Sequence, residues 1–271
     1  MPRLHATLLA SGLVLAFAAC ASTAATDSTK PATAQADAAL DAAIADPARD
    51  PKNVLRDVHR HPRETLGFFQ VKPDATIIEI SPSGGWYSEI LAPYLRDDGR
   101  YVAATGAAPA DSGGGKRNAA LQAKFAASPA RYDRVQWLEY GGKAPVLGAP
   151  GAADVVLTFR NVHNWVAAGT TDAYFQAFFA ALKPGGVLGV VDHRARPGTD
   201  LDTMKKSGYL TEALSSTTRP APASCWTPAA RSTPIRRTAP TIRTACGRCR
   251  RPIATMPAMP RSTRPSAKAT G

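Results

Sequence analysis

Apolar and polar residues alternate along the middle of this 271-residue chain in the rhythm of strands and helices. Apolar runs predict five strands, at 76–80, 100–104, 135–139, 153–159 and 186–192. Apolar residues at helical spacing predict helices between them, at 86–95, 117–127 and 171–182. This alternation favours an α/β fold, built as a doubly wound parallel sheet with right-handed crossovers.

Two prolines upstream of the first strand mark places where helices begin. Asp50-Pro51 and His61-Pro62 each put proline at a plausible first helical position, where its missing N–H costs nothing. We therefore expect two short helices before the sheet starts.

The most informative stretch runs from Thr76 to Tyr87, where an apolar strand ends on an acid and a small-residue turn leads into a helix. A buried parallel strand that enters a tight turn and a helix brings free backbone N–H groups together at the carboxyl edge of a sheet. Nucleotide-like ligands bind at that edge. The stretch therefore predicts a cofactor loop.

This loop resembles that of class I methyltransferases, which use S-adenosylmethionine and carry acid-x-Gly-x-Gly-x-Gly after the first strand. The frame here is Glu79-x-Ser81-x-Ser83-x-Gly85, with serine in place of two glycines. A closer similarity is to a group of predicted bacterial methyltransferases with signal peptides. Its landmarks span about residues 50 to 213, as Arg60–Leu66, Gly84–Pro93, Leu157–Trp165 and Leu182–Gly186.

The resemblance implies a Rossmann-like domain over residues 50–214 and S-adenosyl-L-methionine as the cofactor. It implies cofactor contacts from the loop, at Glu79, Ser81, Ser83, Gly84, Gly85, Trp86 and Tyr87. Each has a plainer interpretation. The carboxylate of Glu79 can simply orient the loop by accepting its N–H groups, and at least one of the two aromatic residues can be a core residue.

The acid that usually ends the second strand and binds ribose hydroxyls is missing. The segment Arg100–Gly106 offers only Thr105 there. Asp111, in the glycine-rich loop that follows, is a possible substitute, and the alternative is an ordinary surface loop.

Polar residues cluster where the fourth and fifth predicted strands end. After the fourth strand we expect His163 as a general base with Asn161 beside it, and Arg160 and Asn164 as substrate contacts. After the fifth strand comes Asp192-His193-Arg194, where His193 and Arg194 are further substrate candidates and Arg194 suits a carboxylate. The alternative is a hydrogen-bonded network that only fixes the loop.

The functional prediction is methyl transfer to an unidentified small-molecule acceptor. The alternative is an exported, catalytically inactive binding or scaffold protein that keeps the fold. Export, the two serines and the missing ribose acid favour that alternative, since S-adenosylmethionine is made in the cytoplasm. No metal site is expected, because Cys246 and Cys249 have the spacing of only half a zinc site.

The formal charge of +12 belongs almost entirely to residues 215–271, which hold ten Arg, one Lys and no acid, leaving +1 for the rest. The charge therefore does not indicate nucleic-acid binding by the folded part. The segment is interpreted as a non-native or disordered basic tail, so the sheet is expected to be truncated after its fifth strand. Our hypothesis is a frameshift near Leu214. One shifted reading contains acids and a helix pattern, resembles the end of the same family, and closes on the letters GESDRM.

The first 20 residues predict a secretory signal: Arg3 and His5 precede an apolar run that is too short to span a bilayer. Cleavage before Cys20 would give a lipid anchor there, and ordinary cleavage near residues 19–24 is the alternative. Residues 21–49 are then expected to be a linker, helical in part. The predicted location is the periplasm, as a free or membrane-anchored protein.

Overall fold

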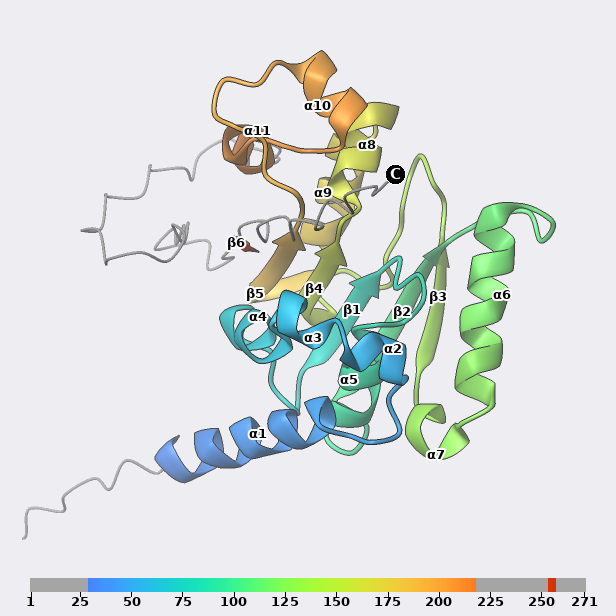
Figure 1. Cartoon of the computed structure of the whole chain (residues 1–271), viewed down its shortest axis with the longest axis vertical. Helices are drawn as coiled ribbons and strands as arrows, with labels where there is room; N and C mark the ends of the chain where they lie inside the picture. The colour runs from blue at the N-terminus through green and yellow to red at the C-terminus, as the bar shows by residue number, and fades with distance from the viewer. Residues whose placement is uncertain (1–28, 218–252, 257–271) are drawn as a thin grey trace, which may run out of the picture.

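In the computed structural model, residues 29–217 and 253–256 are described. They form a six-stranded parallel sheet in the order β3-β2-β1-β4-β5-β6, with helices on both faces (Figure 1). The strands are β1 Thr76–Ile80, β2 Arg100–Gly106, β3 Gln136–Tyr140, β4 Ala153–Phe159, β5 Leu182–Val191 and β6 Ile253–Met256. The predicted α/β doubly wound sheet is confirmed. The signal segment, Cys20, Cys246 and Cys249 lie outside the described residues.

The helices preceding the sheet are α1 Thr29–Ile44, α2 Pro51–Val54, α3 Asp57–Arg60 and α4 Pro62–Phe68. The others are α5 Ser88–Tyr94, α6 Gly113–Ala126, α7 Pro129–Tyr132, α8 Val162–Ala168, α9 Thr171–Ala181, α10 Leu201–Ser207 and α11 Glu212–Thr217. Pro51 and Pro62 stand at the first position of α2 and α4, as the sequence predicted. None of the helices in the described ranges is long and apolar enough to cross a membrane.

Side chains alternate between the two faces of the sheet and so build two cores. Ile77 and Leu157 pack with α4, α5 and α6, through residues such as Leu66, Ile90 and Phe125. Ile78 and Val156 pack on the opposite face against α8 and α9. The strand order reverses between β1 and β4, and ligands of open parallel sheets bind beyond the carboxyl ends at this switch point.

The segment before the sheet is part of the fold, which corrects the expectation of a linker up to residue 49. The helix α1 buries Leu40 and Ala43 in the first core, and Tyr94 of α5 donates to the Ala36 carbonyl at 3.4 Å. Arg49 is fully buried and forms a two-pronged ion pair with Asp57, at 2.6 and 2.9 Å. Burial of these groups fixes the chain that leads into α2 and α3.

The sixth strand corrects the expectation that the tail adds none. Ile253–Met256 pairs in parallel with β5, from Leu188↔Ile253 to Val191↔Met256. An uncovered β5 edge presents unpaired N–H and C=O groups, and the short segment Ile-Ala-Thr-Met carries no proline or charge that would block pairing. The predicted frameshift remains a prediction.

Candidate functional site

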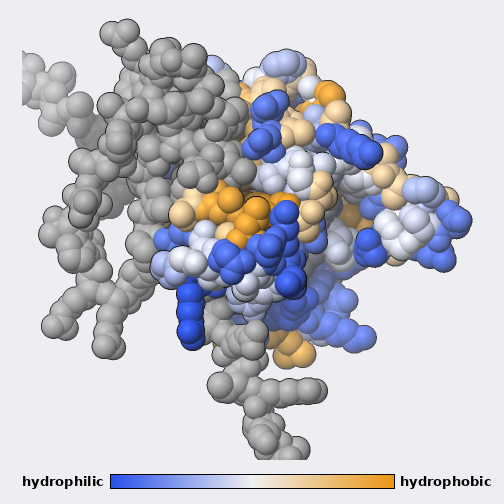
Figure 2. Space-filling view, turned by 90° about the horizontal axis from the view of Figure 1, so that it is seen from above, coloured by the Kyte–Doolittle hydropathy of each residue, from blue (hydrophilic) through white to orange (hydrophobic). Residues whose placement is uncertain are grey.

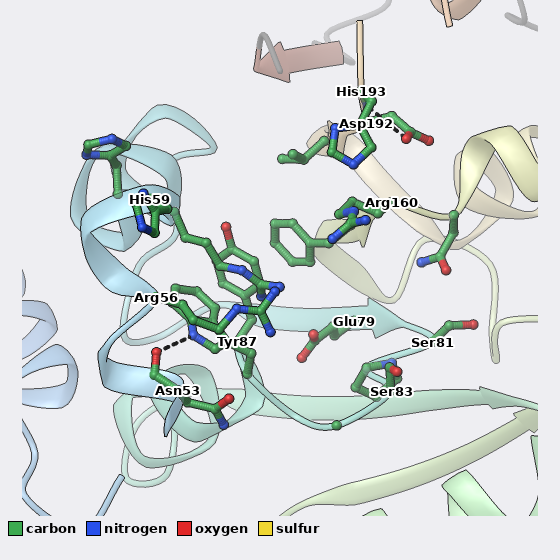
Figure 3. A pocket seen from close by; sticks show the side chains of 18 of the residues that line it. Asn53, Arg56, His59, Glu79, Ser81, Ser83, Tyr87, Arg160, Asp192 and His193 are labelled. Carbon is green, nitrogen blue, oxygen red and sulfur yellow. Dashed lines mark hydrogen bonds between the residues drawn. The ribbon is translucent and has the colours of Figure 1, made fainter. Parts of the chain in front are cut away.

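A cavity of about 830 Å³ opens at the switch point, beyond the carboxyl ends of β1, β4 and β5. One wall comes from residues 53–61 of α2 and α3, and the other from the ends of β4 and β5 (Figure 3). Seen from the side of these strand ends, the molecule shows an apolar area bordered by hydrophilic residues (Figure 2). A cavity of this size is typical of small-molecule sites.

The loop after β1 keeps the backbone of a glycine loop although it contains serines. Ser81, Ser83 and Gly85 have φ of 51°, 57° and 76°, all in the left-handed region that favours glycine. The Ser81 hydroxyl is 2.7 Å from the Tyr140 hydroxyl, and its N–H donates to Ala104. Two serines of the predicted loop therefore hold a backbone conformation that glycine adopts more readily.

The two glycines of this loop face different ways. Gly84 lines the cavity, and a Cβ built on it would meet no atom within 4 Å. A Cβ on Gly85 would come within 2.7 Å of Leu121 Cδ1 in α6, and Gly85 does not line the cavity. Both glycines were predicted as cofactor contacts; Gly84 borders the cavity, whereas Gly85 serves the turn and the packing against α6.

Glu79 lies beneath the loop with its carboxylate buried. Its Oε2 accepts from Tyr101 at 2.5 Å and from Ser88 at 3.0 Å. Burial raises the pKa of Glu79 to about 7, although these hydrogen bonds and the charge of Arg60 pull the other way. A carboxyl group of this kind can exist protonated or ionised near neutral pH. Figure 3 places it at the floor of the cavity.

Aromatic rings line the wall beside Glu79. Tyr87 stacks on Phe159 with ring centroids 3.6 Å apart, and Trp86 packs edge-on against Tyr87 at 4.5 Å. Trp86 is 5% exposed, and its indole N–H donates to the Asn53 carbonyl at 2.8 Å. The core interpretation is confirmed for both rings. Both also line the cavity, so their contact with a cofactor remains a prediction.

His163 is held by Asp192 of the neighbouring strand end. Its Nδ1 lies 2.9 Å from Oδ1 of Asp192, and its backbone N–H donates to Oδ2 of the same carboxylate at 3.1 Å. The N–H of His193 donates to Oδ1 at 2.8 Å. The carboxylate thus orients the ring and leaves Nε2 for chemistry, the arrangement of a general base with an orienting acid. Asp192 was mentioned as part of the polar cluster after the fifth strand but was not among the candidate site residues.

Asn161 borders the cavity, but its amide is committed to the protein. The Nδ2 group donates to the Ile80 carbonyl at 3.2 Å and to the Thr158 hydroxyl at 3.1 Å. These bonds join the ends of β1 and β4. Asn161 is therefore better described as a positioning residue of the loop than as a catalytic one.

Two predicted substrate contacts do not reach the cavity. Neither does Asp111, the possible substitute for the missing ribose-binding acid. Asn164 is exposed on α8 and does not line the cavity. Arg194 pairs with Glu212 of α11 at 2.6 Å, so its guanidinium is used within the fold. Asp111 is exposed in its loop, and neither it nor Thr105 borders the cavity. No residue between 88 and 158 lines this cavity, so the missing ribose acid is not replaced there.

Three arginines border the cavity: Arg56, Arg60 and Arg160. Arg60 lies over the Trp86 ring at 4.6 Å, and its pKa is lowered to about 10, first by burial and then by Arg56. Arg160 was predicted, whereas Arg56, Arg60, His59 and His61 were not named as site residues. The sequence predicted helices beginning at Pro51 and Pro62 in this region. It did not indicate which strand ends those helices cover.

Strained backbone gathers at this cavity. Of the five non-glycine residues with positive φ in the described chain, four line it, namely His61, Ser81, Ser83 and Arg160. Such conformations persist where the surroundings enforce them, and they concentrate at functional sites. In the part of the chain that the structure describes, no group of three or more His, Cys, Asp or Glu side chains is placed to hold a metal ion.

By sequence, the chain matches neither a protein-family profile nor a curated protein. Solved structures with a similar fold include a SAM-dependent methyltransferase from Aquifex aeolicus, at 14% identity over 62% of this chain and 80% of that one, with a TM-score of 0.48. Cofactor-bound Rv0187 from MTB shares 22% identity over 58% and 63%, with a TM-score of 0.34. The SAH-bound methyltransferase PaMTH1 of Podospora anserina shares 15% over 66% and 72%, with a TM-score of 0.33. At these values the likeness carries no conclusion about what this chain binds.

Proposed function

We propose that this chain is an S-adenosylmethionine-dependent methyltransferase acting on a small-molecule acceptor. One arrangement carries the proposal: a loop in glycine-loop conformation and the His163–Asp192 pair border the same cavity at the switch point of a parallel sheet. Cofactor and general base are thus expected side by side. The presence of an oriented histidine supports an enzyme over the scaffold alternative.

The residues of the cavity suit this cofactor. Gly84 leaves open space at the loop, and the carboxylate of Glu79 and the ring of Tyr87 attract a sulfonium cation. The guanidinium of Arg60 offers a partner for the cofactor's carboxylate. When bound, S-adenosylmethionine supplies a methyl group that its sulfonium centre already activates for in-line displacement.

The protein's own tasks are alignment, exclusion of water and proton removal. Asp192 holds His163 through Nδ1, so that Nε2 can take a proton from an acceptor hydroxyl, amine or thiol. Asn161 fixes the loop that carries His163, through its bonds to β1 and β4. Base catalysis of this kind typically contributes about 10²–10⁴-fold to a rate.

A second candidate is an exported binding protein that keeps the fold without the chemistry. The observation that favours it is the absence of a carboxylate at the end of β2, where Thr105 stands. Asp111, the possible substitute, does not line the cavity. We also propose that the protein works in the periplasm, free or anchored through Cys20. The composition of its first 20 residues supports this location.

Calorimetry with S-adenosylmethionine and S-adenosylhomocysteine separates the two candidates. The expected result is saturable binding that is kept within about threefold in His163→Ala, because His163 is placed on the acceptor side. Formation of S-adenosylhomocysteine in the presence of small molecules from the cell envelope should be lost in His163→Ala and kept in Asn164→Ala, its exposed neighbour. A folded protein that binds neither compound at millimolar concentration would favour the binding-protein candidate.

A further inference from the structure

The arginines of the cavity lack acidic partners among the described residues. No carboxylate there lies within ion-pair distance of Arg56, Arg60 or Arg160. By contrast, the ion pairs that the structure does form engage arginines outside the cavity, such as Arg96 with Asp133 at 2.9 Å and Arg194 with Glu212 at 2.6 Å.

Two acids line the cavity, so at most two negative charges stand against the three arginines. The carboxylate of Glu79 is satisfied by Tyr101 and Ser88, and burial disfavours its ionised form. Asp192 binds the ring of His163 and two backbone N–H groups. The cavity therefore carries an excess of positive charge.

The arginines are close enough to repel one another. Arg56 and Arg160 both disfavour the charged form of Arg60, and Arg160 disfavours the charged form of His193. Figure 3 shows Arg56 and Arg160 on opposite walls, with Glu79 on the floor. Like charges held around one space are stabilised by an anion placed between them.

The proposed cofactor does not supply enough negative charge to balance this cavity. S-adenosylmethionine carries a sulfonium and an ammonium against one carboxylate, so it is a net cation. Its carboxylate can occupy one arginine, and Arg60 is the one beside the cofactor loop, over Trp86. Arg160, on the far wall with His163, is left for another anion.

The backbone of Arg160 is fixed at the end of β4, and its exposed side chain lines the cavity from there. Its φ is 62°, its N–H donates to the Val191 carbonyl at 2.7 Å, and the next residue is tied to β1 through its amide. His193, which stacks on Tyr209 with ring centroids 5.0 Å apart, lines the same wall. An anion held here would stand beside the histidine that removes the proton.

We propose that the acceptor carries an oxyanion, either a carboxylate or a phosphate, and that Arg160 binds it and so brings the acceptor to His163. The anion site follows from the geometry of the cavity alone, and its assignment to the acceptor rests on the proposed function. Arginine suits both oxyanions because its planar fork can donate two parallel hydrogen bonds.

The test is calorimetry with inorganic phosphate and with acetate at low salt, with and without S-adenosylmethionine. The parent should bind at least one anion saturably, and the tighter of the two identifies the oxyanion. Arg160→Gln should weaken binding about tenfold or more, which corresponds to loss of one charge-assisted hydrogen bond. The affinity of Arg160→Lys for the anion should lie between those of the parent and Arg160→Gln, because lysine keeps the positive charge but lacks the planar guanidinium. Arg100→Gln, an exposed arginine at the opposite edge of the sheet, should bind as the parent does.

The outcomes separate this inference from the proposed function. A parent that binds S-adenosylmethionine but neither anion overturns the anion site and leaves methyl transfer standing. Anion binding that is equal in the parent and in Arg160→Gln also overturns it. A parent that binds an anion through Arg160 but no S-adenosylmethionine supports the site and overturns the methyltransferase proposal.

Discussion

The ring nitrogen Nδ1 of His163 lies 2.9 Å from Oδ1 of Asp192, and the two residues come from different strand ends. His163 stands near the start of α8, just after β4, whereas Asp192 directly follows β5. The parallel pairing of these strands brings them together, from Val155↔Val187 to Phe159↔Val191. The register of the sheet thus brings the pair together. Disrupting the pair should lower turnover more than it lowers affinity for S-adenosylmethionine.

Replacing Asp192 with asparagine should lower turnover by about 10²-fold or more, with S-adenosylmethionine affinity within about threefold. The reason is that an amide N–H facing Nδ1 favours the wrong tautomer of His163. Turnover with an identified acceptor and calorimetry measure the two quantities. Asp97→Asn, whose side chain is 79% exposed, is the matched control. Equal losses in affinity and turnover would mean that Asp192 only supports the fold.

Glu79 should make stability depend on pH. Its pKa in the folded protein is raised from 4.5 to about 7, so between these values the folded state keeps a proton that the unfolded chain has released. Stability therefore falls as pH rises from about 4.5 to 7, by about 3 kcal/mol relative to Glu79→Gln. Urea unfolding across this range measures the difference. Glu139→Gln, an exposed glutamate of β3, should show no such change relative to the parent.

The same carboxyl group should couple cofactor binding to pH. A sulfonium cation favours the ionised form of Glu79, so affinity for S-adenosylmethionine should rise as pH rises through about 7, with proton release on binding. Calorimetry at pH 6 and pH 8 in two buffers of different ionisation enthalpy measures both effects. Glu79→Gln should show neither, and a pH-dependent affinity that survives in this variant would point to another group.

Gly84→Val should abolish cofactor binding and leave the fold intact. A Cβ at Gly84 meets nothing within 4 Å, so the side chain fits, yet it occupies space at the cavity. Gly142→Val is the control, because Gly142 is equally uncrowded and lies outside the cavity. Thermal unfolding and calorimetry check fold and binding. Gly85→Val should instead unfold the loop, since its φ is 76° and Leu121 is in the way. Normal cofactor binding in Gly84→Val would place the cofactor elsewhere.

Ser83→Gly should stabilise the protein by about 0.5–1 kcal/mol. A left-handed φ of 57° costs a non-glycine residue about 1–2 kcal/mol, and glycine avoids this cost. Part of the gain is lost because glycine makes the unfolded chain more flexible, so that folding costs more conformational entropy. Ser81→Gly should be close to neutral, because it also loses the hydrogen bond to Tyr140. Gln70→Gly, with the same φ outside the cavity, should gain as Ser83→Gly does. Destabilisation in Ser83→Gly, measured by urea unfolding, would show that its side chain makes a contact the protein needs.

Mass spectrometry of the natural protein tests both ends of the chain. Peptides from residues 1–19 should be missing, and the C-terminal peptides should match the shifted reading that ends in GESDRM. A fatty-acid label on the parent that disappears in Cys20→Ala supports the lipid anchor. Arginine-rich peptides from residues 219–264, found in the natural protein, would contradict the frameshift.

The sheet and the loop could be predicted because both are local patterns. The five apolar runs fall on β1 to β5, and the acid-to-glycine frame falls on the turn after β1. Side-chain direction at the strand ends could not be predicted. His193 lines the cavity while its neighbour Arg194 reaches Glu212, and a shift of one residue decides which way each points.

The wall made by α2 and α3 was beyond sequence reasoning for a different reason. Asn53 and Glu89 meet across 36 positions of sequence, through the bond from Asn53 Nδ2 to Glu89 Oε1 at 2.9 Å. Arg49 reaches the same carboxylate, with Nε 3.9 Å from Oε2. No periodicity encodes such contacts. Only the assembled core brings the buried charges together, and with them the arginines that border the cavity.

The buried Arg49 has a consequence for how the protein is divided into parts. Arg49 ties residues 44–57 to α5. The folded domain and the binding cavity therefore both begin upstream of the sheet. A fragment beginning at Thr76 would retain all six strands and the loop with Glu79, but none of Asn53, Arg56 or Arg60. Such a fragment would lack one wall of the cavity. A chimaera built from the sheet alone would therefore keep the fold and lose the complete cavity. A search for relatives that compares only the sheet would likewise miss the residues that form its second wall.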